Sequence, residues 1–251
     1  MIRLGKVRLL MALALAFVFQ PVLAQEETGT IARSWAMTPK AGEAAAFNDA
    51  LKAHAAWRRD NNDPWKWTFW RAASGNMDGT VFIRSTNHTY ADFDAYNQGE
   101  FRDKALADWN ANVAPHVGKA WSGLSRLDSE MVDWPEGDYK VVRVTRFHLK
   151  PGHGSAFRAA VQKVRGKMKE AGRQSTSAWT WLMTGDHLPT IMLITARNNW
   201  AGLDTPEKSA RETLAEMVGE LEANTMMDNA MQHVERISGD MYVRADEFSG
   251  K

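Results

Sequence analysis

The chain has 251 residues, a formal net charge of +1 and no cysteine. A balanced charge without a dense Lys/Arg cluster argues against nucleic-acid binding. The lack of cysteine excludes disulfides and thiol chemistry, so the hydrophobic core alone must stabilise the fold.

The first 24 residues have the pattern of a signal peptide. Arg3, Lys6 and Arg8 form a basic start, an apolar run covers 9–19, and Ala24 precedes a suitable cleavage point. This run is shorter than the ~20 apolar residues of a membrane span, and no later segment is apolar enough to span one. We therefore expect a periplasmic or secreted protein. Without the leader, 28 Lys+Arg remain against 30 Asp+Glu, so the mature charge is near −2.

An internal repeat with a shift of 110 residues runs through the rest of the chain. The matched pairs include Arg33 with Arg143, Gly42 with Gly152, Phe47 with Phe157, Thr80 with Thr190, and Asp94 with Asp204. The matches keep one order along the chain, which chance similarity rarely does. Because solenoid units are roughly 20–50 residues long, this period indicates a duplicated domain. We expect one repeat at 25–136 and a second at 137–251.

Each repeat is predicted to follow the order βαββαβ, the ferredoxin-like motif. A first strand (31–37 and 141–149) leads through a Pro/Gly turn into an amphipathic helix. Two strands then form a hairpin, at 65–69 and 80–83 in the first repeat and at 179–183 and 190–195 in the second. Helical composition returns after Asn87 and Asn198, and a short last strand is predicted near 124–131 and 237–243.

Aromatic side chains alternate onto one face of the first hairpin strand in each repeat. They are Trp65, Trp67 and Phe69 in one repeat, and Trp179 and Trp181 with Met183 in the other. Helices cover only one face of such a sheet, so the other face needs a covering layer. Exposed aromatics would cost ~25 cal/mol per Å2 of apolar surface. We therefore expect the two aromatic faces to pack against each other, giving one α+β barrel within a single chain.

This architecture resembles the dimeric α+β barrel superfamily in its tandem form, over nearly all of the mature chain. The superfamily includes antibiotic-biosynthesis-type monooxygenases, stress-responsive barrel proteins, heme-degrading enzymes and chlorite dismutase-like heme proteins. The resemblance thus implies an oxygenase, cofactor-independent or heme-dependent, as one function, and heme as one cofactor. Because one fold serves many functions, it does not select among them.

Trp67 and Trp181 are the first candidates for a site. Aromatic side chains with a few polar groups are typical of small-molecule pockets, so both could line a pocket for a flat or apolar ligand between the sheets. The alternative is that they pack in a plain hydrophobic core.

Arg33 and Arg143 are candidate ligand-binding residues on the first strands. An arginine on a largely apolar strand face needs an anionic partner. That partner is either a ligand carboxylate or a carboxylate of the protein, such as Glu130 or Asp240, which the repeat also matches.

His54 breaks the repeat, because the second copy has Val164 at the same position of its helix. An inward-facing histidine is a candidate general base or heme ligand; the alternative is a core histidine with its hydrogen bonds satisfied. His148 and His153 lack the helical i, i+4 spacing of a paired metal site, and we find no metal motif.

The sequence therefore predicts an exported tandem α+β barrel that binds a small, partly apolar molecule between its sheets. The alternatives are an oxygenase of the same superfamily, with His54 as the reactive group, and a non-catalytic structural or assembly module. Phosphate-binding loops, dinucleotide fingerprints and hydrolase elbows are absent, and oligomerisation is left open.

Overall fold

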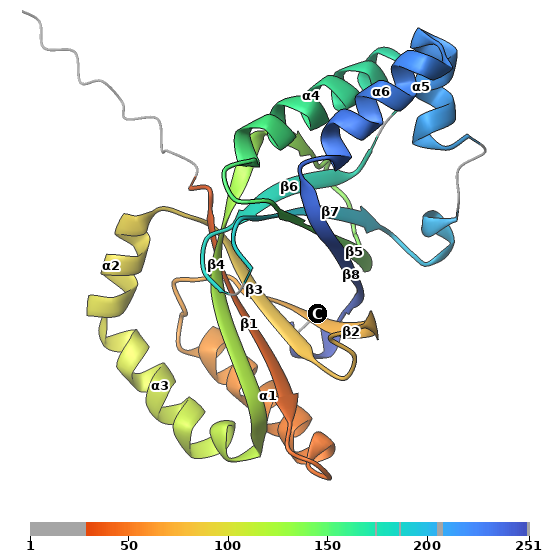
Figure 1. Ribbon diagram of the computed structural model, residues 1–251. Coiled ribbons are helices and arrows are strands. Elements are labelled where there is room, and N and C mark those ends of the chain that lie inside the picture. Colours follow the sequence, from red (N-terminus) through yellow and green to blue (C-terminus); the bar gives the residue numbers. More distant parts are fainter. Residues whose placement is uncertain (1–28, 174, 186, 205–207, 250–251) are drawn as a thin grey trace, which may run out of the picture.

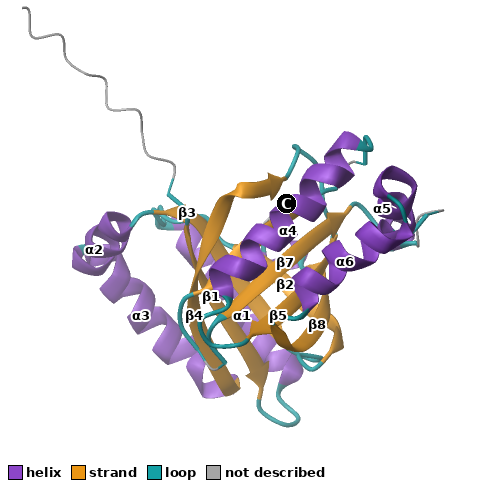
Figure 2. Cartoon of the chain, turned by 45° about the horizontal axis from the view of Figure 1, so that its top comes forward, coloured by secondary structure: helices purple, strands orange, loops and turns teal. Residues whose placement is uncertain are grey.

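A closed antiparallel β-barrel of eight strands forms the centre of the computed structural model, with helices packed around its outside (Figures 1 and 2). The structure describes residues 29–173, 175–185, 187–204 and 208–249. The predicted signal peptide lies outside these ranges. Among the helices within them, none has the length and apolar character to cross a membrane.

Both halves of the chain supply the same succession of elements. In the first half these are β1 (Ile31–Pro39), α1 (Ala44–Asp60), β2 (Thr68–Gly75), β3 (Val81–His88), α2 (Tyr90–Gln98), α3 (Glu100–Asn112) and β4 (Val117–Asp133). In the second half they are β5 (Val141–Leu149), α4 (Gly154–Glu170), β6 (Ser177–Leu182), β7 (Thr190–Arg197), α5 (Ala210–Val218), α6 (Glu220–Met231) and β8 (Val234–Arg244). Short 3-10 helices precede β4, follow β7 and end the described chain as η3 (Asp246–Phe248).

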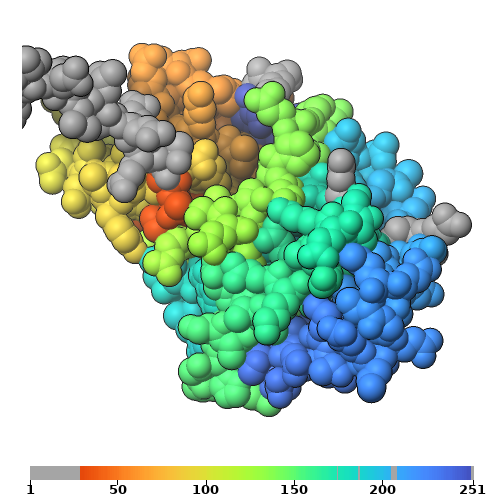
Figure 3. All heavy atoms as spheres, turned by 90° about the horizontal axis from the view of Figure 1, so that it is seen from above, coloured from red at the N-terminus to blue at the C-terminus, as the bar shows by residue number. Residues whose placement is uncertain are grey.

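The strand order around the barrel is β1-β3-β2-β8-β5-β7-β6-β4. Each half contributes four neighbouring strands in the ferredoxin-like order, β4-β1-β3-β2 and β8-β5-β7-β6. Two seams join the halves: β2 pairs with β8, and β4 pairs with β6. The predicted α+β fold, with two sheets forming one barrel, is confirmed. Figure 3 shows the halves, orange to light green and green to blue, meeting along a broad boundary.

The last strand of each half is longer than the sequence predicts. β4 extends over Val117–Asp133 and β8 over Val234–Arg244, in place of the short strands expected near 124–131 and 237–243. Each of these strands pairs with the first strand of its own half and also with a strand of the other half. Pairing on both edges stabilises extended backbone well beyond the apolar positions that sequence patterns detect.

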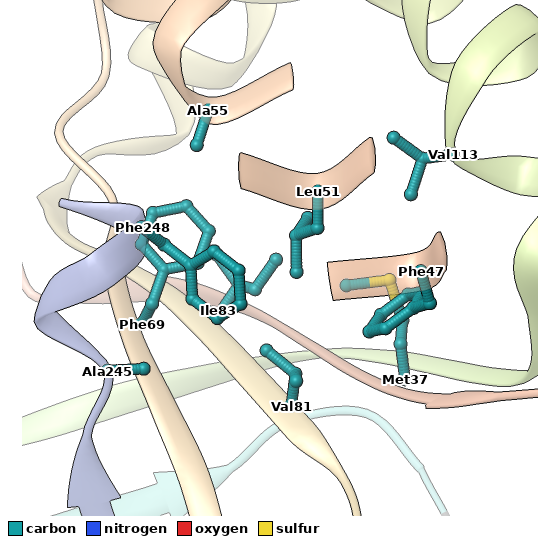
Figure 4. Close-up of a cluster of buried hydrophobic side chains, with 10 residues drawn as sticks. All are labelled: Met37, Phe47, Leu51, Ala55, Phe69, Val81, Ile83, Val113, Ala245 and Phe248. Atoms are coloured by element: carbon teal, nitrogen blue, oxygen red, sulfur yellow. The ribbon is translucent and has the colours of Figure 1, made fainter. Parts of the chain in front are cut away.

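Apolar clusters lie between the strands and the helices, on the outer face of the barrel. Figure 4 shows the first cluster, in which Phe47 and Leu51 of α1 point toward Phe69, Val81 and Ile83 of the sheet. The second cluster joins Phe157 and Val161 of α4 to side chains of the second half's sheet, namely Phe147, Trp179 and Ile191. Phe47 and Phe157, matched by the repeat, are both fully buried.

The prediction that the aromatic faces meet between the sheets is wrong. Trp67 and Phe69 pack against the α1 cluster, and Trp179 and Trp181 pack against the α4 cluster, all on the outer face. Moreover, β2 begins at Thr68, so the backbone of Trp67 precedes the strand. The helix layer also demands an apolar sheet face, and the alternation of a strand does not say which face receives the helices.

The inner wall of the barrel is formed by the strand residues that alternate with those packed under the helices. Because Ile83 faces α1, its neighbours Phe82 and Arg84 face the interior. The pairing registers extend this set to Ala32, Ser34 and Ala36 of β1, Ser125 of β4, Ala178 and Thr180 of β6, and Asp240 and Tyr242 of β8. The same registers also place large apolar side chains on this wall, among them Trp70, Trp121, Met192 and Ile194, so the interior combines apolar, small and polar groups.

Candidate functional site

The first repeat's candidate residues gather on the outer side of the first half. Arg33 lies on β1, Trp67 lies just before β2, and His54 lies on α1. The helices α1, α2 and α3 occupy this side of the barrel (Figure 1). The sequence placed these residues between the sheets, whereas the structure places them between a sheet and its helices.

A group of aromatic side chains fills this layer, and we call it the outer aromatic cluster. Its members are Trp57, Trp65, Trp67, Phe93, Tyr96 and Phe101. Trp65 is its centre: its ring centroid lies 4.4 Å from that of Tyr96, 4.9 Å from Phe93 and 5.8 Å from Trp67. Most of these rings are only partly buried, so the cluster retains accessible aromatic surface.

Arg58 and Asp63 hold Trp67 in place. The Arg58 guanidinium lies 5.1 Å from the Trp67 ring and donates from Nε to Asp63 Oδ2 at 2.6 Å. The Trp67 indole donates from Nε1 to the same carboxylate oxygen at 2.9 Å. Arg58 also donates from Nη2 to the Tyr96 hydroxyl at 2.6 Å, which ties α2 to α1. The indole is thus fixed in orientation before any ligand arrives.

Arg33 has no acidic partner. Its guanidinium lies 4.9 Å from the centroid of the Trp35 ring, and it makes no hydrogen bond or ion pair with another described side chain. Burial lowers the pKa of Arg33, and the nearby Tyr96 phenol partly offsets this effect. A half-buried cation without a counter-charge, next to aromatic rings, is suited to receive an anion.

Of the two alternatives for the repeat-matched arginines, the pairing with Glu130 or Asp240 is wrong. Glu130 accepts from Arg158 at 2.7 Å, and Asp240 forms an ion pair with Arg146 inside the barrel. Arg143 is exposed on the outer face of the second half. The repeat matched residue types correctly, but their partners come from other strands and helices.

His54 is a core histidine between α1 and α3. Its side chain is 4% exposed, and Nδ1 lies 2.6 Å from Asp108 Oδ2. The ring stacks on Trp57 with centroids 6.1 Å apart and meets the edge of Trp109 at 5.4 Å. Burial lowers the pKa of His54, and the hydrogen bond to Asp108 offsets this in part. Because a carboxylate can only accept, the neutral ring donates from Nδ1.

This geometry does not fit heme ligation or a base acting between the sheets. A heme iron needs a ring nitrogen with open space in front of it, whereas helices and two indoles enclose His54. In the described residues no group of three or more His, Cys, Asp and Glu side chains could hold a metal ion.

Trp181 lies apart from the other candidates, beside an open cleft of about 550 Å3 at the seam between the two halves. The cleft is bordered by β4 and the start of α4. The Trp181 indole donates to Asp128 Oδ2 at 3.3 Å, and Arg158 donates to both oxygens of this carboxylate. Asp128 is therefore already paired with both donors. The other cation that lines the cleft, Arg126, is exposed to solvent, whereas Arg33 is half-buried beside an aromatic ring.

Sequence reasoning missed the polar groups of the barrel interior. Arg84, Arg146 and Tyr242 face inward, where Arg146 Nη2 donates to the Tyr242 hydroxyl at 3.2 Å. His148 also faces inward and hydrogen-bonds Thr190 and Ser238. The available signal was the alternation of the strands: Arg84, Arg146 and His148 each neighbour a side chain that packs under the helices, namely Ile83 or Phe147.

Comparison with known proteins bears on the fold alone. No family model matches the sequence, and no curated protein matches it. Among solved structures, the chain is similar to a monooxygenase-like protein from Lactobacillus acidophilus NCFM, with 12% identity, a TM-score of 0.54, and coverage of 86% of this chain and 94% of that one. It is also similar to an anthrone oxidase-like protein (9% identity, TM-score 0.51, 87% and 92% covered).

A third similar structure is a mutant chlorite dismutase from Candidatus Nitrospira defluvii, with 10% identity, a TM-score of 0.51, and coverage of 88% of this chain and 94% of that one. Together with the closed barrel of two ferredoxin-like halves, these likenesses define the class: the chain has the dimeric α+β barrel fold. More particularly, it is the tandem form, with both halves in one polypeptide.

The lowered pKa of His54 predicts a loss of stability in acid. Unfolding returns the imidazole to its ordinary pKa of 6.5, above the folded value. Below pH 6.5 the unfolded chain therefore binds a proton that the folded chain does not. We expect the free energy of unfolding to fall as the pH drops from 7 toward the folded pKa, and His54→Phe to reduce that slope.

Urea titrations of both proteins between pH 8 and pH 5 measure this slope. The difference in the free energy of unfolding between the variant and the wild type should change with pH only below about pH 7. Above this pH the His54 imidazole is neutral in both the folded and the unfolded chain. His88 and His148, whose pKa values burial also lowers, should keep part of the slope in the variant. Parallel pH curves for the two proteins would contradict the prediction.

Proposed function

We propose that the protein is exported and binds a small, partly apolar molecule bearing an anionic group at the outer aromatic cluster of the first half. The observation that carries this proposal is the unpaired guanidinium of Arg33, 4.9 Å from the Trp35 ring. An anionic ligand group would pair with Arg33, and its apolar body would lie against the aromatic rings. Export rests on the signal-peptide pattern of 1–24.

The asymmetry between the halves supports a single site. The repeat replaces Trp35 by Thr145 and leaves Arg143 exposed, so the second half lacks an aromatic partner for its arginine. On the first half, by contrast, the Trp35 ring lies 4.9 Å from the Arg33 guanidinium. The indoles of Trp67 and Trp181 are each held by a carboxylate and its arginine, so the asymmetry lies in the surroundings of the two repeat-matched arginines. Rigid aromatic side chains with a few polar groups are the usual composition of a small-molecule site.

An oxygenase activity is the second candidate. It is supported by the fold likeness to a monooxygenase-like and an anthrone oxidase-like protein. Aerobic incubation with a bound aromatic ligand, followed by mass spectrometry, tests it: a product heavier by one or two oxygen atoms supports an oxygenase, and unchanged ligand supports binding alone.

The repeat offers a matched pair of variants for testing the binding site. Titration of tryptophan fluorescence with a panel of aromatic carboxylates should identify a ligand. Arg33→Met should then weaken its binding about tenfold or more, because a charge-assisted hydrogen bond contributes roughly 1.5–3 kcal/mol. Arg143→Met, at the matched and exposed position, should leave the affinity unchanged.

Thermal melting of both variants checks that folding is retained. Equal effects of Arg33→Met and Arg143→Met, or no effect of Arg33→Met on any ligand found, would place the site elsewhere.

A further inference from the structure

Arg84 extends along the inner wall of the barrel. It lies on β3, directly opposite Ser34 of β1. Its Nη1 donates to Ser34 Oγ at 3.0 Å, and its Nη2 donates to Ser125 Oγ at 3.1 Å. Ser125 belongs to β4, on the far side of β1. The side chain therefore crosses β1 inside the barrel, and two buried hydroxyls fix its guanidinium.

Arg84 has no counter-charge. Its two serine contacts are uncharged, and it makes no ion pair with a described residue. Burial alone lowers its pKa to about 10, so the group is still a cation at neutral pH. Another arginine of the inner wall, Arg146, is neutralised by its ion pair with the buried Asp240. A buried, unpaired cation is costly, so this position favours an anion.

Small residues and aromatic rings surround the Arg84 side chain. The neighbouring inner positions of β1 are Ala32 and Ala36, both 3% exposed. Gly123 of β4 lies opposite Ser34 and is covered by the Trp121 indole, to which a Cβ on Gly123 would approach within 2.5 Å. An aromatic surface follows on the same wall, where the rings of Phe82 and Tyr242 lie 5.6 Å apart. Part of the Arg84 side chain is still accessible to solvent although the residue faces the interior.

We propose that the inner wall at Arg84 is a second binding site, which takes the carboxylate of a small organic acid. The carboxylate would accept from guanidinium N–H groups that the serines leave free, since a guanidinium has five N–H donors. The body of the acid would lie toward Phe82, whose ring is partly accessible, because other side chains already cover Ala32 and Ala36. This site is separate from the outer aromatic cluster, which lies on the other face of the sheet.

Acetate, tested against sodium chloride of equal ionic strength, probes the charged end of this site. A ligand that binds only the folded state stabilises it, and at about ten times Kd the Tm should rise by roughly 3–6 °C for a chain of this size. We expect this rise in the wild type and in Arg33→Met, where the outer cluster has lost its arginine. We expect no rise in Arg84→Met, whose apolar side chain fills a similar volume.

An acetate response that survives in Arg84→Met, or a wild type that responds equally to acetate and chloride, would overturn the proposal. A response lost in Arg33→Met but kept in Arg84→Met would assign the anion to the outer cluster instead. If Arg84→Met does not fold, Arg84→Lys decides the question. Lysine keeps the charge but lacks the planar fork, so acetate should bind several-fold more weakly, and unchanged affinity would overturn the site.

Discussion

Asp240→Ala is expected to destabilise the protein by about 3–5 kcal/mol, because it leaves Arg146 as an uncompensated charge inside the barrel. Asp240 is buried and forms an ion pair with Arg146. Its Oδ1 also accepts from the Met77 backbone N–H at 3.2 Å, across the seam between β2 and β8. Gly75 of β2 packs directly against Asp240 and leaves no room for a side chain, since a Cβ on Gly75 would lie 2.5 Å from Asp240 Oδ1. The substitution therefore disrupts the pairing of the two halves as well as the ion pair.

Urea unfolding monitored by tryptophan fluorescence measures this loss. Asp138→Ala serves as the control, because Asp138 pairs with Arg244 at the surface and most of its side chain is exposed. The control should shift the midpoint little, since exposed ion pairs contribute little to stability. If Asp240→Ala and Asp138→Ala gave similar midpoints, Asp240 would not hold the seam.

The repeat was enough to predict the fold, because the fold depends on the order of elements and on one apolar face for each element. Matched pairs such as Phe47 and Phe157 do lie in matched clusters under α1 and α4. Which face of each sheet the helices cover could not be predicted in the same way. A strand with Trp67 and Phe69 on one side can turn that side to helices or to a second sheet, and the alternation alone does not decide between them.

The candidate site was predicted only in part, for a related reason. Arg33 was identified because an arginine on an apolar strand is conspicuous, and the structure leaves it without an acidic partner. His54 was equally conspicuous, but its partner Asp108 lies on a helix 54 residues later. No local spacing encodes such a contact. Arg84 was missed because the interior was assigned to the tryptophans, which left no reason to examine the other face.

The matched phenylalanines Phe47 and Phe157 also test whether the halves fold as one unit. Both are fully buried, so replacing either by alanine leaves a cavity and should cost about 3–5 kcal/mol. The halves share one barrel through the β2–β8 and β4–β6 seams. Neither half can close its sheet without the other, so we expect each variant to unfold in a single transition at a lower urea midpoint.

Fluorescence and circular dichroism followed through the same urea titration should give coincident curves for both variants. Ile237→Ala is the control, since this side chain is 51% exposed and its removal should change stability by only about 0.5 kcal/mol. Two separated transitions in Phe47→Ala, with one at the wild-type midpoint, would show that the second half folds without the first. The repeats would then be independent domains that share a barrel only after folding, and the seams would contribute little to the stability of either half.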